Sequence, residues 1–167
     1  MTTQTTASIP VDQFRSVLIT MLNEAFDPAE GPTYFLDRGD SFFETLASIS
    51  AEQASRSLGP RSANIAAKVN HTRFYLDAII ANAEAGDFVP VDWEASWAVG
   101  EVDEAEWKDL VDRLRETSDT FRKMAATNEV WNQQTIGGAF GAVTHTAFHL
   151  AEIRQALAAI APDGDRR

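Results

Sequence analysis

The sequence predicts an all-α protein, a four-helix bundle with short extra helices in the first crossover connection. Apolar residues recur with the period of a helix, and no stretch alternates polar and apolar residues for long enough to predict a strand. The 167 residues contain 44% hydrophobic and 23% charged residues, which is typical of one soluble globular domain. We therefore expect a single domain over residues 1–167, with frayed ends at residues 1–9 and 162–167.

The first half of the chain contains one long helix and two short ones. An apolar stripe begins at Val11, and Pro28 and Pro32 end that helix. The stripe consists of Phe14, Val17, Leu18, Met21, Leu22 and Ala25. Ser41 and Ser50 each precede a Glu or Gln by three residues, which is the pattern of a capping box. These two starts predict the short helices of the first crossover, which ends at residues 59–60 (Gly-Pro).

Three further long helices complete the predicted bundle. The second long helix is expected over residues 62–85, and residues 86–100 form a connector that contains Trp93 and Trp97. Asp103 is the predicted N-cap of the third, which extends to about residue 126, and Glu106 completes its capping box. The last helix is predicted from about Thr135 to residue 162.

Charge and composition exclude several classes of function. Fourteen Lys and Arg residues against 25 Asp and Glu give a net charge of −11, which disfavours binding to nucleic acid or to an anionic membrane surface. No run of about 18 apolar residues predicts a membrane span. There is no cysteine, so disulfides, thiolate metal sites and a cysteine nucleophile are excluded. Without a signal-peptide pattern at the N-terminus, we expect a cytoplasmic protein.

The three histidines form the strongest candidate site. His145 and His149 are four residues apart in the last predicted helix, so both imidazoles point from one face and can reach one metal ion. His71 lies in the second long helix, which can face the last helix in a bundle. The spacing alone leaves a second interpretation open, in which each histidine makes an ordinary packing or polar contact.

The neighbours of this pair suggest an inward-facing site with space beside it. Gly138, Gly141 and Ala142 share the histidine face of the last helix, and their small size predicts a cavity. Glu152 lies on the same face and is a candidate fourth ligand or a hydrogen-bond acceptor that fixes a histidine tautomer. Asn64 and Tyr75 flank His71 and are candidates for orienting a ligand or substrate, or for ordinary contacts between helices.

Two further features have both functional and structural interpretations. The tryptophans of the connector either close over an apolar substrate as a lid or plug one end of the bundle. The acidic residues at the start of the third long helix resemble a cation site, but a solvated face that complements the helix dipole explains them better.

Four segments resemble the DinB-like (DinB/YfiT) superfamily. Residues 144–155 (THTAFHLAEIRQ) are similar to the last-helix signature of that superfamily, and residues 64–71 (NIAAKVNH) resemble its second-helix histidine motif. The connector at residues 92–97 and the crossover around residues 46–55 resemble one of its branches. The resemblance extends from about Val11 to residue 161.

This resemblance implies a four-helix bundle of the up-down-down-up type that holds one divalent ion, of the nickel, zinc or manganese class. By motif position the metal ligands are His71, His145 and His149. Ala151 stands where the family commonly has glycine, which predicts closer packing there. Known activities of the family transfer a low-molecular-weight thiol to an electrophile or catalyse a related isomerisation.

Several functions remain open from the sequence. The first is a metal-dependent enzyme that activates a low-molecular-weight thiol or water against a small-molecule substrate, as a thiol S-transferase or a hydrolase. The second is a non-catalytic, stress-related protein that binds a metal or small ligand, and the third is a structural homodimer with vestigial histidines. A homodimer is expected in any case, because the last helix is apolar on the face opposite the histidines as well. That second apolar face comprises Ile136, Phe140, Val143, Leu150 and Leu157.

Overall fold

The computed structural model describes residues 8–59 and 62–160, and all regular secondary structure in these ranges is helical. This confirms the all-α class. The elements are α1 (Val11–Phe26), α2 (Phe42–Ala47), α3 (Ala51–Ser55), α4 (Ile65–Ala85), the 3₁₀ helix η1 (Ala95–Trp97), α5 (Glu104–Thr127) and α6 (Gln133–Ile160). The expected fraying of the chain ends and the end of α6 at residue 162 fall almost entirely outside the described residues.

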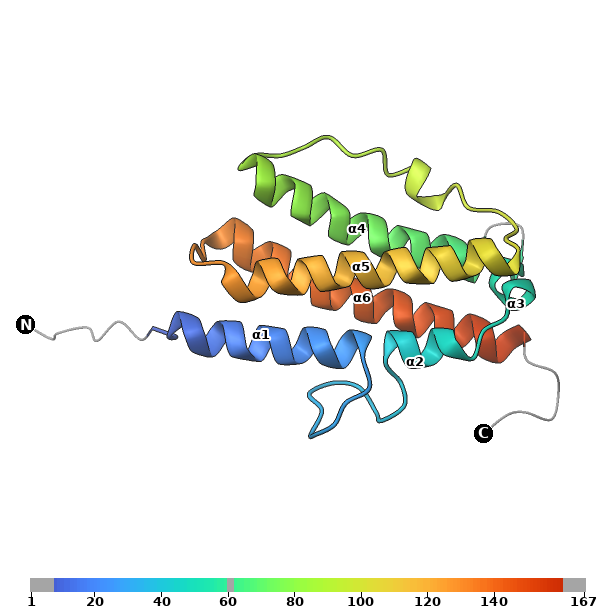
Figure 1. Ribbon diagram of the computed structural model, residues 1–167, viewed down its shortest axis with the longest axis horizontal. Coiled ribbons are helices and arrows are strands. Elements are labelled where there is room, and N and C mark those ends of the chain that lie inside the picture. The colour runs from blue at the N-terminus through green and yellow to red at the C-terminus, as the bar shows by residue number, and fades with distance from the viewer. Residues whose placement is uncertain (1–7, 60–61, 161–167) are drawn as a thin grey trace, which may run out of the picture.

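The long helices α1, α4, α5 and α6 lie side by side along the length of the molecule (Figure 1). Helices α1 and α6 run in one direction, and α4 and α5 run in the other. Helix α4 packs against both α5 and α6, and α1 packs against the same two helices. The short helices α2 and α3 lie in the connection between α1 and α4, as expected for the first crossover.

Capping side chains determine where the helices begin. Asp103 accepts hydrogen bonds from the backbone N–H groups of Ala105 and Glu106, which confirms the predicted start of α5. Helix α4 begins three residues later than predicted, because the Asn64 side chain accepts the Ala67 N–H and so acts as the N-cap. Helix α6 begins two residues earlier than predicted, because the Asn132 side chain accepts hydrogen bonds from the first turn.

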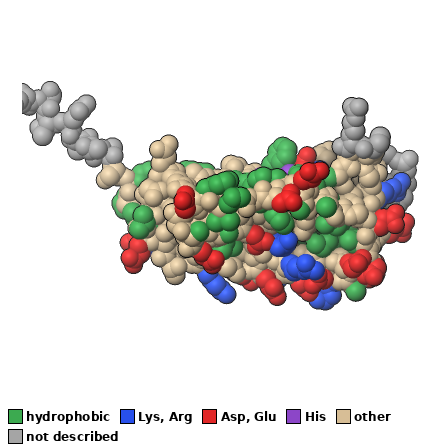
Figure 2. Space-filling view, turned by 90° about the horizontal axis from the view of Figure 1, so that it is seen from above, with side chains coloured by type: hydrophobic (Ala, Val, Ile, Leu, Met, Phe, Trp, Pro, Cys, Tyr) green, Lys and Arg blue, Asp and Glu red, His purple; other side chains and the backbone are tan. Residues whose placement is uncertain are grey.

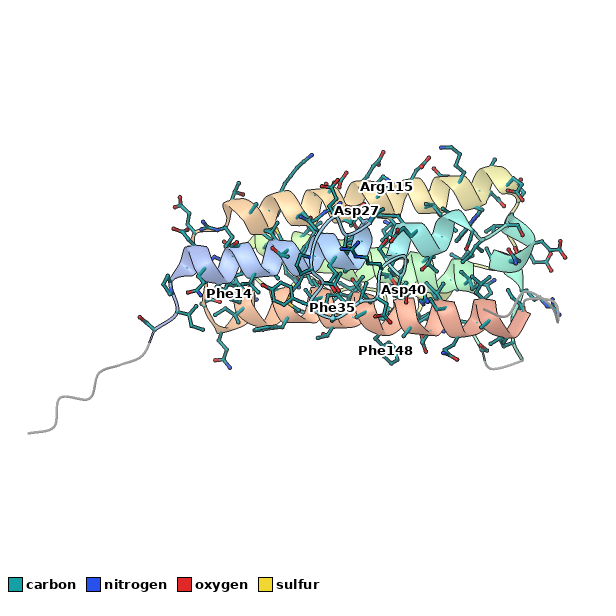
Figure 3. The ribbon with its side chains drawn as sticks, turned by 90° about the horizontal axis from the view of Figure 1, so that it is seen from below. Phe14, Asp27, Phe35, Asp40, Arg115 and Phe148 are labelled. Carbon is teal, nitrogen blue, oxygen red and sulfur yellow. The ribbon has the colours of Figure 1, made fainter. Side chains whose placement is uncertain are left out.

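The core lies between the long helices and extends under α2. Its largest fully buried apolar side chains are Phe26, Phe42, Phe121, Leu22, Ile65, Leu76, Leu114, Leu150 and Ile153. Part of the second apolar face of α6, from which a homodimer was expected, belongs to this core. Val143 and Leu150 of that face are buried within the chain itself. Phe140 and Phe148 remain exposed, and Figure 3 shows Phe148 pointing away from α6.

The connector between α4 and α5 returns along the outside of α4 and contacts it through η1 (Figure 1). Asn70 in α4 donates a hydrogen bond to the backbone carbonyl of Ser96, and Asn64 donates one to that of Gly100. These two bonds fix residues 96–100 against the first half of α4. In the described part of the chain, none of the helices is long and apolar enough to cross a membrane.

Candidate metal centre

The three histidines come together between α4 and α6. His71 lies in the second turn of α4, and His145 and His149 lie on successive turns of α6. Their imidazole nitrogens include a set that lies within 4.8 Å of one another, so the three side chains are close enough to bind one metal ion. His71 and His149 are buried, and His145 is half-buried.

The distances between the nitrogens fit a metal ion. Nε2 of His145 lies 3.2 Å from Nε2 of His71 and 3.2 Å from Nε2 of His149. For three nitrogens at about 2.1 Å from one ion, the separations are about 3.0 Å at right angles and about 3.4 Å in a tetrahedron. Both separations from His145 lie between these two limits, and all three ligand nitrogens lie within 4.8 Å of one another, so one ion could contact all three rings.

A serine in the connector fixes the tautomer of His71. The Ser96 hydroxyl donates its hydrogen to the carbonyl of Trp93 at 2.6 Å, and His71 Nδ1 lies 2.7 Å from the same Ser96 oxygen. Because the hydroxyl has no second hydrogen to donate, His71 must donate from Nδ1. The Nε2 atom of His71 is then left with a lone pair, as a metal ligand requires.

Glu152 fixes the tautomer of His149 in the same way. His149 Nδ1 lies 2.8 Å from a carboxylate oxygen of Glu152, and that oxygen also accepts a hydrogen bond from Lys68 at 2.9 Å. Burial alone would raise the pKa of the Glu152 carboxyl, but the hydrogen bonds from Lys68 and His149 outweigh it and lower the pKa. The ionised carboxylate can only accept, so His149 donates from Nδ1 and presents its Nε2 lone pair.

His145 is held by stacking instead of a hydrogen bond. Its ring stacks on the ring of Tyr75 with centroids 3.8 Å apart and planes 9° apart. Its Nδ1 atom is buried and has no hydrogen-bond partner among the described residues. Its Nε2 atom is therefore the nitrogen with polar neighbours, and those neighbours are the other two histidines.

Burial keeps all three histidines neutral in the folded chain. Desolvation, followed by the nearby His149, lowers the pKa of both His71 and His145 to about 4. Desolvation also lowers the pKa of His149, although the neighbouring Glu152 opposes the shift. At neutral pH none of these imidazoles is a cation, so no positively charged ring opposes the binding of a metal ion.

Aromatic side chains surround the triad. Trp97 stacks on His71 with centroids 3.8 Å apart, and Trp93 makes an edge contact with the same ring at 6.1 Å. Phe148 makes an edge contact with His149 at 5.0 Å and is 60% exposed. Histidine atoms reach the surface in Figure 2 next to hydrophobic and acidic side chains.

The structure separates the other predicted site residues into two groups. Glu152 and Tyr75 contact the triad directly, as described above. Asn64 caps α4 about two turns before His71, and its amide bonds to Ser55 and Gly100, so it has no contact with the triad.

The expected cavity beside the histidines is displaced. A Cβ atom at Gly141 would lie 2.5 Å from the Tyr75 hydroxyl, so the Tyr75 side chain occupies the space that this glycine provides. Ala142 is fully buried. Of these three small residues, Gly138 lines the cavity that the described part of the chain forms between α4, α5 and α6, and that cavity lies further along the helices.

Two residues that contact the centre were missed from the sequence, Ser96 and Lys68. Ser96 comes from a connector whose path over α4 is not encoded in a local pattern, whereas Trp97 of that connector was among the expected candidates. Lys68 could have been identified from the sequence, because it is a charged residue three positions before His71 within an apolar segment. A lysine buried at such a position requires an acidic partner, and Glu152 is that partner.

The chain matches no protein-family model, no curated protein sequence and no solved structure. The functional argument therefore depends on the geometry of the centre.

Proposed function

We propose that this protein binds one divalent metal ion through Nε2 of His71, His145 and His149, and that it is a metal-dependent enzyme of the DinB-like type. The closeness of three neutral imidazoles, with nitrogens within 4.8 Å of one another, carries this proposal. The directions of α1, α4, α5 and α6 support the up-down-down-up four-helix bundle of that superfamily. The ion belongs to the nickel, zinc or manganese class, for which imidazole is a suitable ligand.

Three protein ligands leave coordination positions for a small molecule. A divalent ion held there would act as a Lewis acid and lower the pKa of a bound thiol or water. We propose attack on a small electrophile, with thiol S-transfer as the preferred reaction and hydrolysis as the alternative. Because the chain contains no cysteine, the thiol must come from a low-molecular-weight co-substrate.

The surrounding residues have separate roles in this proposal. Ser96 and Glu152 accept the Nδ1 protons of His71 and His149, which keeps both Nε2 lone pairs directed inward. Tyr75 and Trp97 fix two of the rings by stacking. The exposed parts of Trp97 and Phe148 form an apolar border that favours an electrophile with an apolar body.

Metal analysis and spectroscopy test this function. Protein prepared without a histidine tag should contain about one divalent ion per chain. After substitution with cobalt, glutathione, bacillithiol or mycothiol should change the visible spectrum, and His149→Ala should abolish that change. Bound metal with no response to any of the three thiols would contradict the transferase and leave hydrolysis or non-catalytic metal binding. No metal in the wild type, or equal metal in a variant lacking all three histidines, would contradict the centre itself.

We propose separately that the protein is a homodimer, although fewer residues support this than the sequence indicated. The exposed rings of Phe140 and Phe148 on α6 support it, whereas Val143 and Leu150 no longer do. Light scattering at micromolar concentration should give twice the mass of the chain, and a monomer would contradict the proposal.

A further inference from the structure

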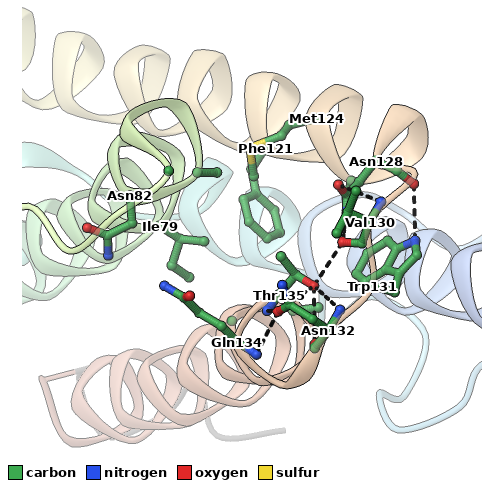
Figure 4. Close-up of a pocket in the computed structure, with 15 residues that line it drawn as sticks. Ile79, Asn82, Phe121, Met124, Asn128, Val130, Trp131, Asn132, Gln134 and Thr135 are labelled. Atoms are coloured by element: carbon green, nitrogen blue, oxygen red, sulfur yellow. Dashed lines mark hydrogen bonds between the residues drawn. The ribbon is translucent and has the colours of Figure 1, made fainter.

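A second site of a different character lies between the same helices, beyond the metal centre. It is a cavity of about 370 Å³, open to solvent, between α4, α5, α6 and the loop that joins α5 to α6 (Figure 4). This volume lies within the range of about 300–1,000 Å³ that small-molecule sites occupy. Its lining includes no Asp, Glu, Lys, Arg or His.

The interior of the cavity is apolar. Phe121, Ala125 and Ala139 line it and are buried in the core, and Ile79 and Met124 complete its inner wall. The Trp131 ring borders the loop side, where its indole N–H donates to the Asn128 carbonyl. An interior of this composition favours aromatic or aliphatic ligand groups over water.

Most polar groups in the lining are already bonded to the loop itself. The Asn128 amide bonds at both ends to the backbone of Val130. The Thr135 hydroxyl donates within the same loop, and Oδ1 of Asn132 caps α6. These groups hold the loop in place and offer little to a ligand.

Two amides in the lining have bonding capacity left. Oδ1 of Asn82 accepts the backbone N–H of Val89 at 2.6 Å, which orients this amide and leaves its Nδ2 without a partner among the described residues. In the same residue ranges, no hydrogen bond involves the side-chain amide of Gln134. Figure 4 shows the polar ends of Asn82 and Gln134 directed toward each other from α4 and α6. They offer both donors and an acceptor without any charge.

The cavity is separate from the metal centre. Ile79 lies eight residues after His71 in α4, and Gly138 lies seven residues before His145 in α6, which corresponds to about 11 Å along the helices. Between the two sites the Tyr75 side chain fills the space at Gly141. A ligand in the cavity therefore lies on the far side of Tyr75 from the three imidazoles.

We propose that this cavity is a binding site for an uncharged small molecule, with an apolar ring-containing body inside and one neutral polar group between Asn82 and Gln134. A charged ligand is disfavoured, because no lining residue can pair with its charge when it leaves water. The site is independent of the proposed metal chemistry.

Two fluorescent probes with the same ring skeleton test the charge preference. N-phenyl-1-naphthylamine is uncharged, and 8-anilino-1-naphthalenesulfonate carries a sulfonate. The uncharged probe should bind the full-length protein at least tenfold more tightly, as measured by fluorescence titration. Equal or tighter binding of the sulfonate, or no binding of the uncharged probe, would overturn the proposal.

Matched variants locate the bound probe. A side chain at Gly138 enters the lining and first meets Ile79 at 3.5 Å, whereas one at Gly137 meets nothing within 4 Å. Gly138→Leu should weaken binding of the uncharged probe at least tenfold, and Gly137→Leu should leave it unchanged. Ala83→Trp and Ala85→Trp provide a second pair, because both residues are exposed on α4 but only Ala83 lines the cavity. If neither Gly138→Leu nor Ala83→Trp weakens binding relative to its control, the probe binds elsewhere and the proposal is wrong.

Discussion

Helices α4 and α6 contribute to two sites that differ in almost every physical property. At the candidate metal centre, titratable side chains lie close together, and the connector supplies a hydroxyl and an indole ring from outside the helix pair. At the cavity, titratable side chains are absent from the lining, and the adjoining loop satisfies its own polar groups. The segments packed beside this helix pair therefore account for much of the difference between the two linings.

Tyr75 and Gly141 form the boundary between the two sites. The tyrosine ring stacks on His145 on one side, and its hydroxyl occupies the position where any larger residue at 141 would place a Cβ atom. The small residues were expected to provide a cavity at the histidines, but Gly141 accommodates the Tyr75 side chain, and Gly138 lines a cavity further along the helices.

The largest expected effect comes from removing one of the proposed metal ligands. His145→Ala should abolish stoichiometric metal binding, since two imidazoles cannot complete the set, while circular dichroism keeps its helical signal. The same variant should bind N-phenyl-1-naphthylamine with unchanged affinity, because the cavity lies beyond Tyr75. If the variant lost binding of both the metal and the probe, the two sites would be coupled, and the contrast between them would be wrong.

Removing a hydrogen-bond partner of a ligand should have a smaller effect. Ser96→Ala removes the acceptor of the His71 Nδ1 proton and should weaken metal binding about 10–100-fold. Competition with a chelator measures this change. Glu94→Gln, an exposed change in the same connector, is the control and should leave the affinity within about twofold of the wild type.

The stability of the metal-free protein should depend on pH through the histidine centre. Burial and the neighbouring His149 lower the pKa of His71 and His145 to about 4 in the folded chain, from 6.5. Between pH 6.5 and 4 the unfolded chain therefore binds protons that the folded chain does not, so the free energy of unfolding decreases as the pH falls through this range.

Urea denaturation in the presence of a chelator measures this slope, and His71→Gln/His145→Gln should reduce it. Lys68 and Glu152 also face these rings, and both remain in the variant. An unchanged slope would show that the buried histidines do not cause the pH dependence. The cavity lining contains no group that titrates in this range, so the affinity of the folded protein for the uncharged probe should stay constant.

The smallest expected effect is a change in stability on substitution of Gly141, which lies beside Tyr75 at the boundary between the two sites. Gly141→Ala places a Cβ atom against the Tyr75 hydroxyl and should lower the free energy of unfolding by about 1 kcal/mol, as overpacking does. Gly137→Ala meets nothing and should raise it by up to about 1 kcal/mol through helix propensity alone. Chemical denaturation of both variants gives the difference, and equal stabilisation would show that Tyr75 moves aside at no cost.

The sequence by itself determined the features that arise within one helix or at its ends. Apolar period and capping residues located all four long helices, with errors of two or three residues where Asn64 and Asn132 act as caps in place of the predicted starts. The four-residue spacing of His145 and His149 places both on one face of α6, because an α-helix has 3.6 residues per turn. Helical period also predicted that Glu152 would share that face.

Only the tertiary structure decided which side chains from separate segments meet. Ser96 reaches His71 across 25 residues, and Lys68 reaches Glu152 across 84, and neither pairing is visible in a local pattern. The position of the free space was also a tertiary outcome, because the path of a side chain from the opposite helix determines whether a glycine leaves a gap. Tyr75 fills the space at Gly141, whereas the nearest side chain to a Cβ at Gly138, that of Ile79, leaves ordinary contact distance, and the cavity lies about two turns away from the histidines.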